Sequence, residues 1–147
     1  MTGYIYTFGC RFINNAIWIQ AASLLAVRLW IAEIFFMSGL TKTKNWTTTL
    51  ALFEDEYKVP LLSHEIAAYI ATSMELVLPL LLILGLMTPF SAIGLFVMTL
   101  VIEVFIYPDT TEHYYWLLLL GILFTHGGGK FGLDYWILRR IKKYPSI

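Results

Sequence analysis

The sequence predicts an all-α protein, a polytopic membrane four-helix bundle that forms one integral membrane domain over residues 1–147. The first observation is composition: 59% of the residues are hydrophobic, only 14% are charged, and the mean hydropathy is +0.71. A soluble protein of this length carries far more polar surface. The second observation is a series of four apolar segments, three of them close to the roughly 20 helical residues that cross a hydrocarbon core and the fourth shorter.

The four predicted spans cover residues of about 17–40, 64–87, 89–107 and 114–127. Thr88-Pro89 predicts a tight turn between the second and third spans, and the polar stretch YPDTTEH precedes the fourth. The fourth span is the shortest, because three consecutive glycines at 127–129 interrupt its apolar run. The longest connection contains WTTTLALFEDEY, an amphipathic segment of a kind that lies in the membrane interface.

Basic residues predict the orientation of the spans, because cytoplasmic loops are enriched in Lys and Arg. If both termini are cytoplasmic, that side carries Arg11, Lys130 and the basic residues of the C-terminal tail. The opposite side carries three lysines, offset by the acidic run at 54–56. We therefore predict that both termini are cytoplasmic. The tail, residues 134–147, is either a basic interfacial segment beside anionic lipid headgroups or a solvated end.

Four charged residues lie inside the predicted spans: Arg28, Glu33, Glu75 and Glu103. A charge inside a bilayer is costly and usually faces a partner or a cavity. Counting from the middle of each span places Arg28 level with Glu75, and Glu33 level with Glu103 about 6–8 Å nearer the outside. Arg28 is therefore the predicted partner of Glu75. Pro79, one turn after Glu75, leaves the backbone carbonyl of Glu75 without its helical donor.

Two interpretations of these charges remain open. They form buried ion pairs that fix the register of the helices, or they line a polar pocket that holds a headgroup or relays protons. Glu33 and Glu103 either share a proton or approach a lysine at the end of the first span. No residue is assigned a catalytic role. The candidates for ligand binding or proton relay are Arg28, Glu33, Lys42, Glu75 and Glu103.

The sequence indicates no intrinsic cofactor. The single cysteine, Cys10, cannot form an internal disulfide or a redox pair. The three histidines lack the spacing of a metal site, and their predicted depths disfavour haem. Any electrons that the protein handles would therefore travel on something other than its own thiols.

The stretch HGGGKFGLD is the second unusual segment, with Gly127, Gly129, Lys130 and Asp134 as its candidate functional residues. Consecutive glycines cost backbone entropy and need a structural reason. They either allow a tight turn at the membrane surface or present amides to an anion beside Lys130. The tight turn is the favoured interpretation.

Four segments in order, RLWIAEIFFMSGLTK, MELVLPLLLILGLMT, VFIYPDTTEHYYWLLLL and HGGGKFGLD, resemble the DoxX family of small four-helix bacterial membrane proteins. The resemblance covers roughly residues 24–137. Gly128 and Gly132 depart from the family's usual Pro and Ser in the last motif. The residues that occupy the positions of the family's motifs are Arg28, Lys42, Glu75, Lys130 and Asp134.

The resemblance implies a multi-pass protein of the bacterial inner membrane, linked to quinone-reducing or other membrane redox complexes. One hypothesis is thus a subunit or accessory of such a system, in which Arg28 and Glu75 polarise a quinone carbonyl. The chain would then be an oxidoreductase only together with a redox partner protein. The alternative is a non-enzymatic membrane scaffold, or a carrier for a small solute or metal-peptide. Both hypotheses involve the lipid bilayer, allow a homo-oligomer, and include no nucleic acid.

Overall fold

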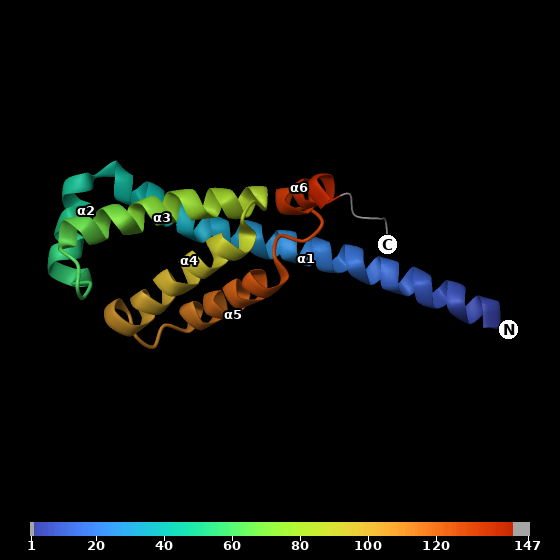
Figure 1. Cartoon of the computed structure of the whole chain (residues 1–147). Coiled ribbons are helices and arrows are strands. Elements are labelled where there is room, and N and C mark those ends of the chain that lie inside the picture. The colour runs from blue at the N-terminus through green and yellow to red at the C-terminus, as the bar shows by residue number, and fades with distance from the viewer. Residues whose placement is uncertain (1, 143–147) are drawn as a thin grey trace.

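The computed structural model describes the backbone of residues 2–142 and the side chains of residues 16–141. Within these residues the chain is helical and has no strand (Figure 1). In chain order the elements are α1 (Thr2–Lys44), α2 (Trp46–Leu52), the π-helix η1 (Phe53–Tyr57), α3 (His64–Leu84), α4 (Thr88–Val101), the π-helix η2 (Ile102–Ile106), α5 (Thr111–His126) and α6 (Leu133–Lys142).

Helix boundaries follow local sequence signals. The Ser63 hydroxyl accepts a hydrogen bond from the Ile66 amide at 3.4 Å and caps the start of α3. Gly85 ends α3 with a φ of +64°, a left-handed conformation that favours glycine. Pro89 lies in the first turn of α4, where its missing N–H costs nothing. The three signals place the tight turn between α3 and α4 where the sequence predicts it.

The structure confirms three of the predicted spans. Ala16–Lys44, His64–Leu84 and Thr88–Ile106 are long and apolar enough to cross a membrane. The predicted fourth span corresponds to α5, whose 16 residues are fewer than the roughly 20 that a full crossing needs. The amphipathic connection forms α2 and η1, and most of the predicted tail falls in α6. Residues 143–147 of that tail lie outside the described residues.

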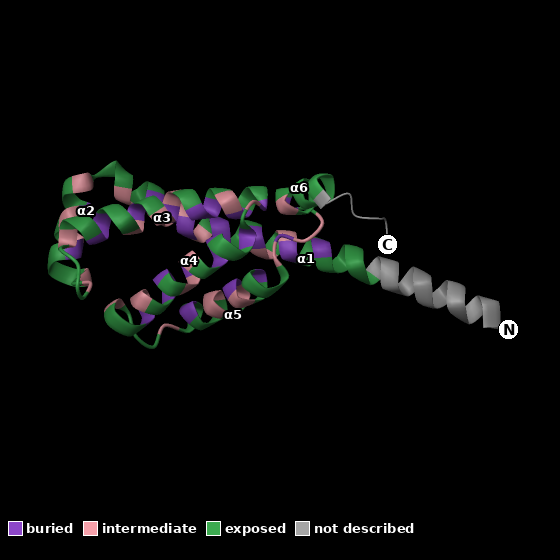
Figure 2. Cartoon of the chain, viewed as in Figure 1, coloured by how far each residue is buried: buried purple, intermediate pink, exposed green. Residues whose placement is uncertain are grey.

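The helices pack in a ring of neighbours: α1 on α3, α3 on α4, α4 on α5, and α5 back on α1 (Figure 1). Phe35 of α1 meets Trp116 of α5 edge to face, with ring centroids 5.6 Å apart. Buried residues lie mostly where the helices face one another, and exposed residues lie on the outside (Figure 2). Many of the exposed residues are large and apolar. This inverted surface suits a hydrocarbon solvent. Fully buried side chains of the core include Ile31, Leu82, Leu95, Leu120 and Leu123.

Candidate functional site

Arg28 lies at one end of the packed helices, where it holds the loop between α5 and α6. Its Nη1 donates to the Gly128 carbonyl at 2.6 Å and its Nη2 donates to the Phe131 carbonyl at 3.5 Å. The side chain is completely buried. Its partners are thus backbone carbonyls rather than a carboxylate.

Glycines make room for this guanidinium. A Cβ at Gly85 would overlap Arg28 Nη1 and the Gly132 Cα, and a Cβ at Gly128 would lie 2.8 Å from Nη1. The Asp134 carboxylate accepts from the amides of Met87 at 2.8 Å and Thr88 at 3.0 Å, which caps α4. We call this assembly the closed end; it consists of Arg28, Gly85, Gly128, Gly132 and Asp134.

The glycine loop forms a tight turn, as the sequence favours. Gly127 and Gly129 have φ values of +67° and +66°, which side-chain-bearing residues rarely adopt. Lys130 lies over the ring of Trp18, with Nζ 5.0 Å from the centroid. This contact is a cation–π interaction with α1.

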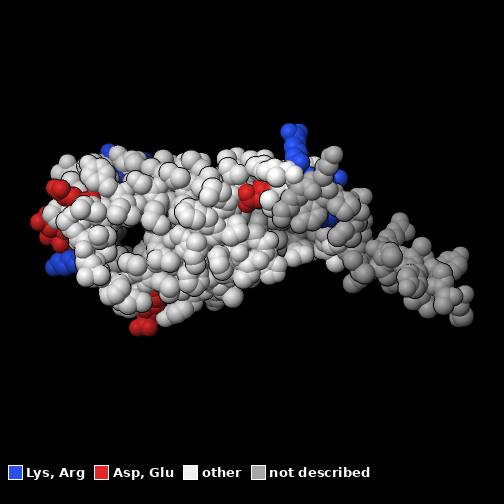
Figure 3. Space-filling view, viewed as in Figure 1, with Lys and Arg blue, Asp and Glu red and all other residues white. Residues whose placement is uncertain are grey.

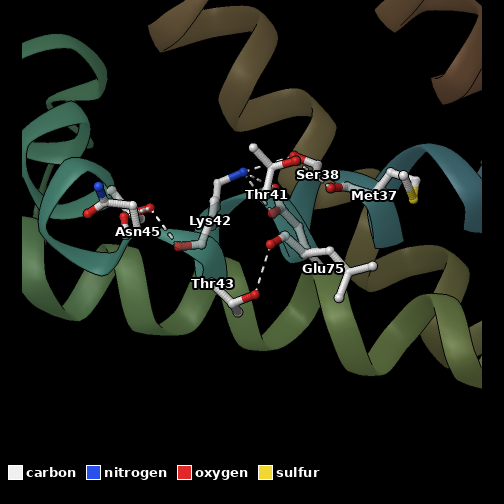
Figure 4. A network of polar contacts seen from close by, with 9 residues as sticks. Met37, Ser38, Thr41, Lys42, Thr43, Asn45 and Glu75 are labelled. Carbon is white, nitrogen blue, oxygen red and sulfur yellow. Dashed lines mark hydrogen bonds and ion pairs between the residues drawn. The ribbon is translucent and has the colours of Figure 1, made fainter.

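Glu75 pairs with Lys42, not with Arg28. Lys42 Nζ donates to Glu75 Oε2 at 2.7 Å, to Glu75 Oε1 at 2.9 Å and to the Ser38 hydroxyl at 2.8 Å. Figure 4 shows the lysine and carboxylate pointing toward one another between α1 and α3. These contacts use all three protons of the ammonium group.

The predicted pairing of Arg28 with Glu75 is wrong because the two helices pack in another register. Gly39 lies against Glu75, since a Cβ on Gly39 would be 3.0 Å from Glu75 Cβ. Arg28 instead lies against Gly85. Glu75 and Gly85 are ten positions apart along α3 and its C-cap, which separates the two levels by about 15 Å. The middle of the first predicted span therefore does not face the middle of the second.

Glu103 pairs with His113, so it neither shares a proton with Glu33 nor pairs with a lysine, the two arrangements that the sequence left open. Glu103 Oε2 lies 2.7 Å from His113 Nδ1, and Oε1 accepts from the Asp109 amide at 2.9 Å. Glu33 is exposed on the outer side of α1. The sequence contained a signal for His113: a short turn joins the third and fourth spans, so residues on either side of it lie close together.

The two charge pairs contribute to the wall of one cavity, which we call the chamber. Its volume is about 440 Å³, and its titratable groups are Lys42, Glu75, His113 and the two tyrosines Tyr57 and Tyr107. Both π-helices border it, and π-helical turns occur frequently at functional sites. The remaining wall is mainly apolar and includes Phe53, Ala67, Ile70, Met74, Val97, Met98, Val101 and Ile106.

Two tyrosines form the outer edge of the chamber, which we call the roof. Tyr107 donates a hydrogen bond to the Glu56 carboxylate, and its ring meets Tyr57 at 6.0 Å between centroids. The hydrogen bond to Glu56 raises the pKa of Tyr107, and burial raises the pKa of Tyr57. Both shifts favour neutral phenols beside the apolar wall.

A second cavity of about 620 Å³, the vestibule, lies beside the end of α1 and α2. Ser38, Lys42 and Tyr57 line both cavities. The vestibule is the more polar of the two, with Thr41, Lys44 and other hydroxyl-bearing or amide side chains in its wall. Lys42 thus stands between a polar space and an apolar one.

The donors and acceptors of the chamber suit a small polar headgroup. The Ser38 hydroxyl accepts from Lys42 and donates its own proton to the Glu75 carboxylate. His113 uses Nδ1 for Glu103, which leaves Nε2 for another partner. Among the described residues, no three His, Cys, Asp or Glu side chains are grouped as a metal site requires.

Comparison with known proteins identifies the family. A family model described as DoxX matches residues 23–108, more than half of the 147 residues. The chain belongs to the DoxX family. The DoxX match includes Arg28, Lys42, Glu75 and Glu103, whereas His113 and the glycine loop follow it.

The chain is also 35% identical over 140 residues to an uncharacterized protein of Haemophilus influenzae. That alignment covers 86% of this chain and 89% of the relative. No solved structure matches this DoxX chain.

Proposed function

We propose that this DoxX-family chain is a membrane subunit that binds the headgroup of a quinone in the chamber and serves a partner redox protein. The observation that carries the proposal is the chamber itself, because it combines apolar walls with Lys42, Glu75 and His113. Ligand sites typically have volumes of about 300–1,000 Å³, apolar linings and a few placed polar groups.

The chain's own residues would bind and orient the ring. His113 Nε2 can accept a hydrogen bond from the hydroxyl of a reduced quinone ring, since Nδ1 is already used by Glu103. The Ser38 hydroxyl lies at the Lys42–Glu75 pair beside the ring. Lys42 and Glu75 keep a charge pair beside the ring without leaving either charge unpaired. A bound quinone would supply the electron-transfer chemistry, as cofactors generally do. Arg28 has no part in this site.

The proposal includes a four-helix bundle in a bacterial inner membrane with both termini cytoplasmic. The closed ring of helix contacts supports the bundle. The basic residues of α6 support the orientation, because Lys and Arg are enriched on the cytoplasmic side. The exposed Glu33 supports contact with a partner helix or a second copy, since a carboxylate in hydrocarbon needs a polar neighbour.

Solvent extraction and mass spectrometry of the purified protein test quinone binding. We expect close to one quinone per chain after incubation with a quinone in lipid nanodiscs. The variant Ser38→Ala/His113→Phe should lose most of it. Glu33→Gln is the matched control, because it changes a polar side chain outside the chamber. A wild-type protein that retains no quinone above the level of empty nanodiscs would overturn the proposal.

The second candidate is a carrier for a small solute, and the paired cavities favour it. A solute could pass between vestibule and chamber if the Lys42–Glu75 pair opened, because Lys42 lines both spaces. This candidate predicts that a quinone-free protein in vesicles accumulates or releases a solute, and that Lys42→Met changes the rate. Quinone retained by the wild type and lost from the chamber variant would favour the first proposal.

A further inference from the structure

The space between α3 and α4 begins at a close contact between the two helices. The two helices run antiparallel from the turn at Gly85 and touch closely at Gly94, where a Cβ would lie 2.7 Å from Leu78 Cδ1. Beyond this contact they diverge (Figure 1). The chamber occupies the widening space, since its wall begins about one turn further along both helices, at Met74 and Val97.

The side of the chamber between these helices is open. Ile70 of α3 and Val97 of α4 both line the chamber, yet 47% and 52% of their surfaces are exposed. Figure 3 shows a hollow between α3 and the α4–η2 segment, surrounded by uncharged side chains. Both residues belong to helices long and apolar enough to cross a membrane. The opening therefore faces hydrocarbon when these helices are in a bilayer.

The polar end of the chamber is more restricted. Tyr107 reaches Glu56 across the roof, and Tyr57 packs against Tyr107. Lys42, held by Glu75 and Ser38, stands between chamber and vestibule. A ligand with a hydrocarbon part meets less polar surface at the side opening than at the roof.

We infer that the chamber receives an amphiphile from the bilayer through the opening between Ile70 and Val97, which we call the portal. The polar head of this ligand lies near Lys42 and Glu75, and its hydrocarbon tail leaves through the portal. This inference deepens the proposed function and rests on it for the chamber being a binding site. The route and the tail do not depend on the head being a quinone.

Spin-label accessibility tests the portal without any ligand. In a Cys10→Ser background, nitroxide labels at Val101→Cys report from the chamber wall. Labels at Leu80→Cys report from an exposed position on α3 outside the chamber, and labels at Thr41→Cys report from the vestibule. Collisions with oxygen, which dissolves in lipid, are compared with those of a water-soluble nickel chelate in vesicles.

We expect the Val101 label to resemble the Leu80 label, with high oxygen and low nickel accessibility. The double variant Ile70→Trp/Val97→Trp should lower oxygen accessibility at Val101 by at least about half and leave Leu80 unchanged. Nickel accessibility at the level of Thr41 would mean that the chamber opens to water and would overturn the portal. Inaccessibility to both reagents would mean a sealed chamber and would overturn it too.

A ligand arm tests the tail and separates this inference from the proposed function. A decyl-tailed quinone should lower oxygen accessibility at Val101 more than its tail-less ring at the same membrane concentration. If the tailed and tail-less quinones lowered oxygen accessibility equally, the inference that the tail leaves through the portal would be overturned. If no quinone is retained but oxygen alone reaches Val101, the quinone proposal fails and the portal stands. If quinone is retained but the nickel chelate reaches Val101, the quinone proposal stands and the portal fails.

Discussion

The closed end and the chamber hold buried charges in opposite ways. Arg28 donates to the carbonyls of Gly128 and Phe131, and glycines let backbone and neighbouring side chains approach its guanidinium closely. Lys42 and Glu75 neutralise each other through side chains and border a cavity of about 440 Å³. Burial of a charge therefore does not by itself mark a binding site. What distinguishes the second region is free volume beside a charge pair that is already satisfied.

The choice of cation matches each region. The planar guanidinium offers several donors in a fixed fork, which suits carbonyls arriving from one loop. Arg28 Nε and Thr88 Oγ1 nevertheless have no hydrogen-bond partner among the described residues. The ammonium of Lys42 is a compact charge on a flexible stem, and such a group can move while its carboxylate partner stays in place. The cation of the closed end is thus held in one fixed arrangement, whereas the cation of the chamber can change its position.

The largest expected effect is at the closed end. Gly85→Ala would place a Cβ on Arg28 Nη1 and the Gly132 Cα, at a φ of +64°. Overpacking and left-handed strain together should cost about 4 kcal/mol or more and leave little folded protein. Thermal unfolding in detergent and the yield of monodisperse protein measure this.

Gly121→Ala in α5 is the matched control, because nothing lies within 4 Å of the added Cβ. This change should raise the free energy of unfolding by roughly 0.5–1 kcal/mol, since alanine favours the helix. If both alanine variants were equally stable, close glycine contact would not be what maintains the closed end.

Rescue experiments give the next largest effect and separate the two regions directly. Lys42→Met leaves the Glu75 carboxylate buried without its partner, which should cost about 3–5 kcal/mol. Lys42→Met/Glu75→Gln should recover most of this loss, because the unpaired charge is gone. A double-mutant cycle on unfolding free energies measures the coupling.

Arg28→Met should not be rescued by any single second substitution, because the partners of Arg28 are backbone carbonyls. The most stringent second change is Asp134→Asn, which removes the carboxylate that caps α4 within the closed end. Recovery of stability in Arg28→Met/Asp134→Asn would show that the closed end is an ion pair as well, and the contrast with the chamber would disappear.

Sequence reasoning identified the membrane class, three spans and most of the charged residues that the structure places in the closed end and the chamber. Composition and hydrophobic length were enough for this, because they depend on the bilayer alone. It could not pair those charges, because pairing depends on helix register. The register is visible at Gly39 and Gly85, where small residues let other helices approach closely. The Glu103–His113 pair was within reach, since a short turn joins them. The chamber depends on two π-helices and on the divergence after Gly94, which no local pattern predicts.

The smallest expected effect concerns the roof and depends on pH. Tyr107 donates to Glu56, and this hydrogen bond raises the pKa of the phenol. A raised pKa means that the folded state holds the proton more tightly than the unfolded state. The resulting stabilisation is complete below the ordinary tyrosine pKa of about 10 and is lost as pH rises through the higher folded value.

Tyr107→Phe should therefore lower stability only slightly at pH 7, by well under about 1 kcal/mol, because solvent screens a side chain that is 44% exposed. The difference in Tm between wild type and variant should stay constant up to about pH 10 and shrink above it. A difference unchanged at higher pH would mean that the phenolic proton donated to Glu56 does not hold the roof. The chamber would then resemble the closed end, with its boundary fixed by shape alone.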